Sequence, residues 1–212
     1  MKQGRILIFA CLLGLLSANE ASGAAYDDFL NAVKTGDARE IRQLLRRGVD
    51  ANTTDAGGQS VLHLASRGGT LEVAQALVTA GAEIDRRNKN GETPIMLAAL
   101  GGHRNVVEFL LSKEAQINQP GWTALLYAAT NGHASIVKIL LENHAYIDSS
   151  PSSGLTPLMM AARGGHIDTV KLLLDEGADA SLKNDLGETA YDWALRGGNT
   201  NIAALIKANL KS

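Results

Sequence analysis

Apolar residues recur along the chain in short paired runs, each with the spacing of one face of an α-helix. The first run contains Phe29, Ala32 and Val33, and the second starts at Ile41, after the polar break at Gly36-Asp37. Apolar positions three and four residues apart predict amphipathic helices. Because the same alternation continues to the end of the chain, the pattern predicts a succession of short helix pairs.

One polar-to-apolar transition recurs at a fixed interval. A hydroxyl residue stands before the first apolar run of each pair, at Ser60, Thr93, Thr123, Thr156 and Thr189. The interval is 33 residues, except from Thr93 to Thr123, where it is 30. Ser or Thr at this place caps a helix by accepting a main-chain N–H bond. A constant period of this length predicts a stack of similar structural units rather than one globular core.

The repeated segment resembles the ankyrin repeat over residues 26–212. The resemblance rests on Gly-x-Thr-Pro at the start of a unit, Gly-His in its middle and Gly-Ala near its end. The first element occurs at 91–94 and 154–157 and in part at 187–189, the second at 102–103, 132–133 and 165–166, and the third at 81–82 and 177–178. The resemblance implies an all-α solenoid of about six helix–turn–helix units with β-hairpin-like fingers.

The resemblance also implies the borders of the units. An N-terminal cap repeat is expected at 26–54 and a C-terminal cap repeat at 184–212, with four repeats between them at 55–87, 88–119, 120–150 and 151–183. The first unit is rich in charge and the last helix is rich in polar groups. Both features suit the ends of a stack, which have a neighbour on one side only.

Two units depart from the repeat where the second helix ends. Glu114 and Asn143-His144 replace the usual glycine. A residue other than glycine with positive φ is uncommon, and Asn tolerates that conformation best, so we expect Asn143 to form the cap of its helix. The finger after Glu114 is three residues shorter than the others, and Pro120 leads directly into the next unit. We therefore expect a local irregularity of the stack at this point.

The beginning of the chain has the layout of a secretory signal peptide. Lys2 and Arg5 precede the apolar run Ile6–Leu16, and small residues follow it. This order predicts that residues 1–23 are removed by cleavage near 23–25. An eleven-residue apolar run is too short to span a bilayer, so we expect no stable membrane anchor after removal. A leader before a small ankyrin-like array resembles exported proteins of Gram-negative bacteria, which implies the periplasm.

Composition narrows the classes of function. The net charge is −2 and becomes −3 without residues 1–23, so we expect no nucleic-acid partner. Cys11 is the one cysteine, and the mature chain would have no thiol for a disulfide, a metal site or a nucleophile. Aromatic residues make up 4% of the chain, and Leu and Ala dominate instead, which suits thin, closely stacked helices. Repeat arrays of this kind are often monomers, and we expect a monomer.

The remaining candidates for chemistry fit structural roles better. His103, His133 and His166 fall at one repeat position, where the resemblance implies a contact between units rather than the close spacing of zinc ligands. The Gly-Gly pairs lack the strand and the Lys-Ser/Thr of a phosphate loop. The first glycine of each pair has no evident reason and should weaken its helix end by about 0.5–1 kcal/mol. We predict no catalytic residues, no metal and no cofactor.

The resemblance places partner binding on the concave side, formed by the finger tips and the inner helices. One position on each inner helix lines this side, at Lys34, Arg67, Leu100, Thr130, Arg163 and Arg196. The finger position before the hydroxyl residue adds Glu92, Trp122, Leu155 and Glu188. We expect Trp122 and Leu155 to be adjacent and exposed. Because exposed Trp and Arg often dominate interface energy, we hypothesise an apolar anchor at these two residues, flanked by arginines.

These observations lead to one functional hypothesis with two alternatives. The hypothesis is a non-catalytic protein–protein interaction scaffold that is exported and binds an unidentified protein partner through its concave face. The first alternative is an immunity or inhibitor protein that blocks a toxin or an enzyme. The second is an accessory factor that supports oxidative-stress defence, a role implied by the resemblance to exported bacterial ankyrin proteins.

Overall fold

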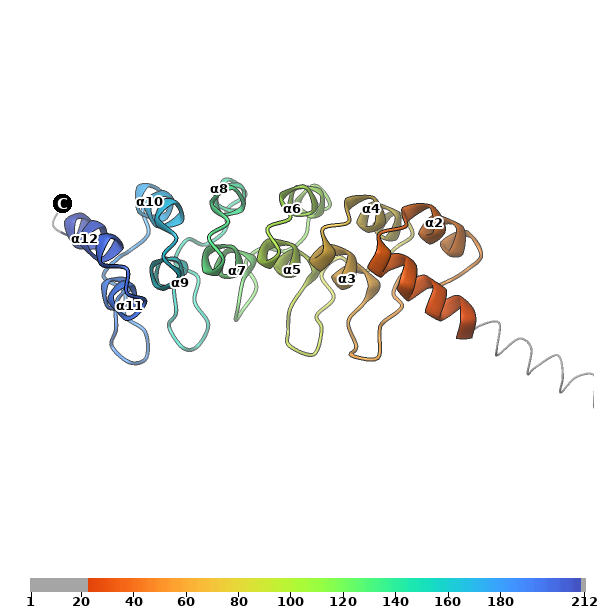
Figure 1. Cartoon of the computed structure of the whole chain (residues 1–212), viewed down its shortest axis with the longest axis horizontal. Coiled ribbons are helices and arrows are strands. Elements are labelled where there is room, and N and C mark those ends of the chain that lie inside the picture. The colour runs from red at the N-terminus through yellow and green to blue at the C-terminus, as the bar shows by residue number, and fades with distance from the viewer. Residues whose placement is uncertain (1–22, 211–212) are drawn as a thin grey trace, which may run out of the picture.

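The computed structural model describes residues 23–210 and arranges them as a single file of helix pairs (Figure 1). The inner helix of the first pair covers residues 23–35. The other inner helices are α3 (Val61–Gly68), α5 (Pro94–Leu100), α7 (Ala124–Thr130), α9 (Pro157–Gly164) and α11 (Ala190–Arg196). The outer helices are α2 (Ala38–Arg46), α4 (Leu71–Thr79), α6 (Arg104–Leu111), α8 (Ala134–Glu142), α10 (Ile167–Asp175) and α12 (Thr200–Asn209).

Neighbouring pairs pack in the order of the sequence. From α3 to α11, each inner helix contacts the next inner helix and the outer helix of its own pair. The outer helices form a second tier above them, and the fingers project from the opposite side, as Figure 1 shows. The prediction of an all-α repeat solenoid is confirmed.

The repeated hydroxyl residue directly precedes the inner helices α3, α5, α7, α9 and α11. Thr123 Oγ1 accepts the N–H of Leu126 at 3.2 Å, and Thr156 Oγ1 accepts the N–H of Met159 at 3.3 Å. Pro157 occupies the first turn of α9, where its fixed φ suits a helix and its missing N–H is not needed. The periodic transition seen in the sequence therefore sets the first turn of α7 and α9. At α5 the predicted cap is wrong, because Thr93 Oγ1 has no partner within the described residues.

Small and aliphatic side chains form one continuous core. Each of the central inner helices carries two fully buried alanines in succession, such as Ala98 and Ala99 in α5. Residues of the outer helices, such as Val106, Val107 and Leu110, are also fully buried. Small side chains between the inner helices allow their backbones to approach closely. This packing explains how the chain builds its core with few aromatic residues.

The fingers have the shape of hairpins but little of their main-chain pairing. Among residues 23–210, β pairing is limited to one isolated antiparallel bridge between Thr54 and Ser60. In three fingers a side chain reinforces the main-chain bonds that close the loop. Asp55, Asn88 and Asn184 each accept, at 2.9–3.0 Å, the N–H of the residue just before the repeated hydroxyl residue. Such turns suit Asp and Asn because their short side chains reach their own main chain.

A hydrogen bond, here called the helix joint, ties each unit from the third onward to the one before it. The side chain just before an outer helix donates to a main-chain oxygen at the end of the inner helix of the previous unit. The pairs are His103–Arg67 (2.8 Å), His133–Leu100 (3.1 Å), His166–Thr130 (2.9 Å) and Asn199–Arg163 (2.9 Å). Since the acceptor is a carbonyl, each of these histidines carries its proton on Nε2. The prediction that the histidines mark contacts between units is confirmed.

The helix joints explain several of the paired glycines, including Gly101, a first glycine of the kind for which the sequence offered no reason. A Cβ added to Gly101 would lie 2.5 Å from Cδ2 of His103, in the same unit. One added to Gly69 would lie 2.3 Å from Nδ1 of that ring, which belongs to the next unit. Gly69 also has a φ of 69°, which favours glycine. Gly101 and Gly69 therefore leave room for the His103 joint, whereas a Cβ on Gly68 would meet only Thr70 Cγ2 at 4.0 Å and one on Gly198 would meet nothing within 4 Å.

A second contact, here called the base joint, ties the bases of consecutive fingers. An Asn or Asp side-chain oxygen accepts the N–H of the residue two positions after the left-handed cap of the next unit. The pairs are Asn52–Glu83 (2.8 Å), Asp85–Gln116 (2.9 Å), Asn118–Tyr146 (2.9 Å) and Asp148–Asp179 (3.2 Å). Asn118 keeps its joint although its finger is three residues short, so the expected irregularity is confined to the tip of that finger.

Two residues other than glycine have positive φ within the described range, Glu114 at 63° and His144 at 66°. The prediction for Glu114 is confirmed. Asn143 is the C-cap of α8, but the expectation that it takes the left-handed conformation is wrong, because its φ is −99° and His144 has that conformation instead. His144 aligns with Gly81 and Gly177, so the position in the repeat decides the conformation rather than the intrinsic preference of Asn.

Residues 1–22 and 211–212 lie outside the described part of the chain. The predicted signal peptide and Cys11 fall almost wholly there, and the structure says nothing about them. Among the helices of residues 23–210, none has both the length and the apolar character needed to cross a membrane.

Candidate functional site

The six inner-helix positions singled out in the sequence differ along the stack. Their side chains are exposed at Lys34, Arg67, Arg163 and Arg196, and half-buried at Leu100 and Thr130. The main-chain oxygens of Leu100 and Thr130 accept helix joints. This series, here called the inner row, is therefore basic towards both ends and uncharged at its centre.

Glu92 organises the part of this surface next to Arg67. Its Oε2 accepts from Asn88 at 2.7 Å, and its Oε1 accepts from the hydroxyl of Tyr127 at 3.0 Å. The guanidinium of Arg67 lies 3.8 Å from Oε2. The three partners belong to three consecutive units, and Glu92 is only 8% exposed. A single carboxylate thus connects three units and holds Arg67 close to the surface.

The environment of Glu92 favours its charged form. Burial alone would raise the pKa of Glu92, but hydrogen bonds from Asn88, Tyr127 and Asn90, with the charge of Arg67, outweigh it and leave the pKa lowered. Burial, the hydrogen bond to Glu92 and the charge of that carboxylate together raise the pKa of Tyr127 to about 12. At neutral pH the site therefore contains a carboxylate, a neutral phenol and a guanidinium in fixed positions.

A second cluster lies at the C-terminal end of the inner row. Trp193 Nε1 donates to Glu188 at 3.0 Å, and Arg196 forms an ion pair with the same carboxylate. The guanidinium groups of Arg163 and Arg196 lie 5.1 and 5.8 Å from the centre of the Trp193 ring, within the range of cation–π contacts. Trp193 is 6% exposed, so the two arginines cover it.

Trp122 and Leu155 are less accessible than expected. Both are half-buried, and the expectation of two exposed side chains is wrong. The Trp122 ring lies 5.1 Å from the ring of Tyr127 at an interplanar angle of 44°, and Leu155 packs against the core. These contacts take up much of both side chains, so the proposed anchor is a partly covered apolar surface rather than a projecting one.

His63 connects the second finger with the third. Its Nδ1 accepts from Ser60 Oγ at 2.7 Å, and its Nε2 donates to the main-chain oxygen of Glu92 at 3.0 Å. Burial lowers the pKa of His63, which keeps the ring neutral in the folded protein. The ring therefore ties neighbouring loops together, as the resemblance implied.

Sequence reasoning missed Tyr127 and Trp193, which complete the two clusters. Both are the fourth residue after the repeated hydroxyl residue, where other units have Leu64, Leu97 or Met160. An aromatic residue at a position that is otherwise aliphatic was the available signal. The partners themselves could not be inferred, since they depend on which side chains of neighbouring units meet.

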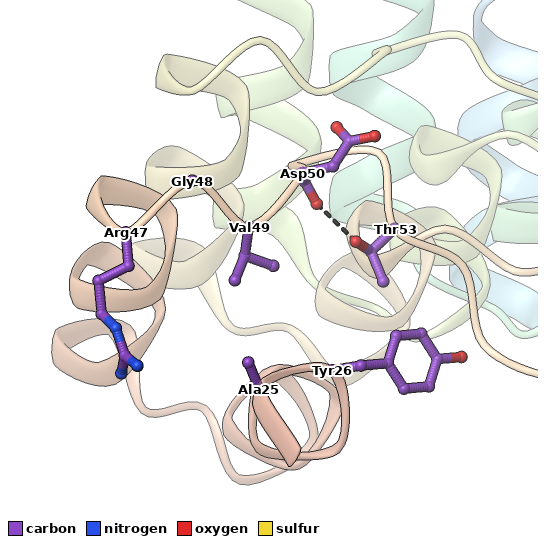
Figure 2. A pocket seen from close by; sticks show the side chains of 7 residues that line it. All are labelled: Ala25, Tyr26, Arg47, Gly48, Val49, Asp50 and Thr53. Atoms are coloured by element: carbon purple, nitrogen blue, oxygen red, sulfur yellow. Dashed lines mark hydrogen bonds between the residues drawn. The ribbon is translucent and has the colours of Figure 1, made fainter. Parts of the chain in front are cut away.

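Other groups within the described residues suggest no further chemistry. No set of three His, Cys, Asp or Glu side chains in residues 23–210 is placed to hold a metal ion. A cavity of about 360 Å³ lies at the N-terminal end of the stack, between the first helix and the loop after α2. Figure 2 shows the residues that line it. The hydroxyl of Thr53 donates to the main-chain oxygen of Asp50 there at 2.7 Å, and that of Tyr26 donates to Thr54 at 2.7 Å. These hydroxyls are already engaged, and we assign no reaction to this cavity.

Comparison with known proteins agrees with the geometry of the stack. Residues 29–120, 69–151 and 125–211 each match the family model described as ankyrin repeats in three copies. No curated protein matches the chain significantly. Ankyrin repeats generally mediate protein–protein interactions and are typically non-catalytic. With the repeated helix pairs, the capped inner helices and the helix joints, these matches show that the chain belongs to the ankyrin-repeat family.

Proposed function

We propose that the mature chain is a non-catalytic scaffold in the periplasm that binds a partner protein through the face formed by its inner helices and fingers. The observation that carries this proposal is a set of arginines that are exposed yet held in place. Arg67 pairs with Glu92, while Arg163 and Arg196 lie against Trp193. Arginine and tryptophan are the residue types that most often dominate interface energy.

Holding these arginines before binding favours association. A long side chain that is ordered only on binding loses conformational entropy at that moment, which weakens affinity. Contacts with Glu92 and Trp193 limit that loss in the free protein. The charges also select the partner, because the inner row is basic towards both ends and uncharged at its centre. We expect a partner surface with an apolar centre and acidic groups on either side.

A binding experiment with matched variants tests the role of this face. Residues 24–212 would be immobilised and exposed to a periplasmic extract, and bound proteins identified by mass spectrometry. Replacing Arg67, Arg163 and Arg196 by Ala should weaken capture of the partner by about tenfold or more. The matched control replaces Arg104, Lys138 and Lys171 by Ala, because these exposed basic residues lie on outer helices. Equal capture by both triple variants would contradict the proposal.

The predicted leader supports the periplasmic part of the proposal, and a separate measurement tests it. Cells producing the full chain should yield a shortened protein in the periplasmic fraction, with its new N-terminus between residues 23 and 26. Full-length protein that remains in the cytosol would overturn the location. If the captured partner is an enzyme that loses its activity on binding, the scaffold is an inhibitor.

A further inference from the structure

The two clusters of the inner row differ in their balance of charge. In the first, one cation, Arg67, lies beside one carboxylate, Glu92, so their charges cancel. In the second, Arg163 and Arg196 both lie against Trp193, but the cluster has a single carboxylate, that of Glu188. At neutral pH the second cluster therefore has one positive charge in excess, whereas the first has none.

The excess charge belongs to Arg163. Both oxygens of Glu188 are already engaged, because Oε1 pairs with Arg196 and Oε2 accepts from Trp193 Nε1 at 3.0 Å. Among residues 23–210, the guanidinium of Arg163 forms no ion pair, and none of its N–H groups donates a hydrogen bond. The side chain is exposed, so these donors are open to a ligand.

Arg163 is nevertheless held in place. Its guanidinium lies over the ring of Trp193, 5.1 Å from the ring centre, and this ring is only 6% exposed. Trp193 is fixed in turn by its hydrogen bond to Glu188 and by the packing of α11 on α9. A guanidinium over an aromatic face can still present the N–H groups at its edge to an anion. The ring therefore positions Arg163 without using its hydrogen-bond donors.

Each of the other basic residues of the inner row lacks one of these two properties. Arg67 and Arg196 are held but are already paired with a carboxylate. Lys34 is exposed, and no hydrogen bond, ion pair or ring contact within the described residues holds its ammonium group. The three arginines all lie in the last turn of their helices, so the favourable interaction with the helix dipole does not distinguish them. Within the inner row, Arg163 alone is both held and unpaired.

The shape and charge of this group indicate its ligand. A guanidinium binds a carboxylate or a phosphate through two parallel hydrogen bonds. One excess positive charge is balanced by one carboxylate, whereas a phosphate group, with roughly two negative charges, would be repelled by the nearby Glu188. The side chain of an Asp or a Glu on the surface of a partner protein supplies a group of the required shape and charge.

We propose that Arg163 determines which partner the inner row accepts, by binding the carboxylate of one Asp or Glu side chain of the partner while Trp193 holds the guanidinium. The two paired arginines contribute less, because a second carboxylate would have to compete there with the one already bound. This inference rests on the proposed function for the origin of the carboxylate. Binding of a carboxylate at Arg163 is nevertheless measurable without knowing the partner.

The test uses acetyl-Gly-Asp-Gly-amide, which carries one carboxylate, at constant ionic strength. Trp122 and Trp193 are the two tryptophans of the chain, so nuclear magnetic resonance resolves two indole N–H signals, which Trp122→Phe assigns. The Trp193 signal should shift with a dissociation constant on the order of 10 mM. The matched peptide with Asn in place of Asp should leave it unchanged, and inorganic phosphate should bind more weakly. Equal shifts with both peptides, or tighter binding of phosphate, would overturn the proposal.

Variants at Arg163 separate its charge from its packing. Arg163→Met keeps an apolar side chain over the Trp193 ring and removes the charge, so it should weaken binding of the Asp peptide by about tenfold or more. Arg163→Lys keeps the charge without the planar fork and should restore part of the binding. Lys171→Ala, on the outer helix of the same unit, is the control and should leave binding unchanged. Full binding to Arg163→Met would contradict the proposed contact.

Two further comparisons complete the test. Glu188→Gln adds to the excess charge and should strengthen peptide binding by about threefold, an effect that a purely structural role of Arg163 would not produce. In the capture experiment, Arg163→Met should weaken capture of the partner more than Arg67→Met does. Equal capture by the parent chain and Arg163→Met would refute the carboxylate contact but not the scaffold. Peptide binding at Arg163 without any captured partner would refute the scaffold alone.

Discussion

The third and sixth fingers share the pattern Asn-x-x-Gly-Glu-Thr, yet their glutamates bind different parts of the molecule. In both, the Asn side chain accepts the N–H of the Glu and donates to its carboxylate. Glu92 then binds Arg67 of the unit before it and Tyr127 of the unit after it. Glu188 binds Trp193 and Arg196, which belong to helix α11 of its own unit.

The comparison separates what the finger itself determines from what the neighbouring units determine. The pattern of the finger fixes where the carboxylate lies, and the surrounding units decide what it binds. In the middle of the stack, neighbours on both sides supply the partners, and the side chain of Glu92 is 11% exposed. At the end of the stack α11 supplies them, and the side chain of Glu188 is 21% exposed. The same motif connects units in one place and completes a terminal unit in the other.

Removing each carboxylate should give the largest difference between the two regions. Glu92→Ala leaves Asn88, Tyr127 and Arg67 without their shared partner, and we expect the free energy of unfolding to fall by about 2–4 kcal/mol. Glu188→Ala should lower it by about 1 kcal/mol, because the Glu188 side chain is more exposed and its ion pair is better screened by solvent. Urea unfolding monitored by circular dichroism measures both. Equal losses would mean that connecting three units adds nothing to stability.

Glycine substitutions should lower stability more at the C-terminal end of the stack than in its middle, which is the opposite of the order expected for the carboxylates. A Cβ on Gly197 would lie 2.2 Å from the main-chain oxygen of Arg163, which cannot move alone, whereas the nearest atom to a Cβ on Gly101 belongs to the His103 side chain. We expect Gly197→Ala to destabilise by about 1–3 kcal/mol and Gly101→Ala by less. Thermal unfolding of the two variants checks this. Stabilisation by either change, the usual effect of Gly→Ala in a helical conformation, would show that the joints have room.

The hydroxyl of Tyr127 should contribute less than the carboxylate it binds. Tyr127→Phe removes one hydrogen bond to Glu92 and should lower stability by about 1–2 kcal/mol. Tyr146→Phe, at an exposed tyrosine, is the control and should have little effect. Absorbance titration should also show one tyrosine ionising at about pH 12 in the parent chain and missing in the variant. A phenol that titrates near its ordinary pKa of 10 would contradict the contact.

Acid should produce the smallest of these effects. The pKa of Glu92 is lowered in the folded protein, so its contribution to stability is complete above the ordinary value of 4.5 and is lost as the pH falls through the lowered value. Glu92→Gln should therefore flatten the pH dependence of unfolding below 4.5. Urea midpoints measured in steps from pH 6 to pH 3 test this. If the variant loses as much stability in acid as the parent chain does, other carboxylates cause the loss.

Much of the fold follows from the sequence because the repeat places equivalent residues at equivalent points. The starts of the inner helices α3 to α11, the shortened fourth finger and the positive φ of Glu114 could all be predicted from position alone. Asn143 was predicted wrongly because residue preference was given more weight than position. The turn geometry is set by the stack, which requires the left-handed residue at His144.

The site was less predictable because it depends on side chains that meet across units. Nothing in the sequence near Gly101 shows that the His103 ring fills the space beside it. Likewise, Arg163 and Trp193 are 30 residues apart in the sequence, and only the stacking of α9 on α11 brings them together. The inner row could be located from the sequence, but its contacts could be recognised only in the structure.

The base joints have a consequence for how the chain can change in length. Asn118, at the start of its finger, binds the next unit, and Thr123, at the end of the finger, caps α7. Residues can therefore be added to or deleted from a tip while both attachment points stay where they are. Finger length becomes a variable that is independent of the scaffold, so foreign loops inserted at the tips should be tolerated where equal insertions within α5 or α7 would not be.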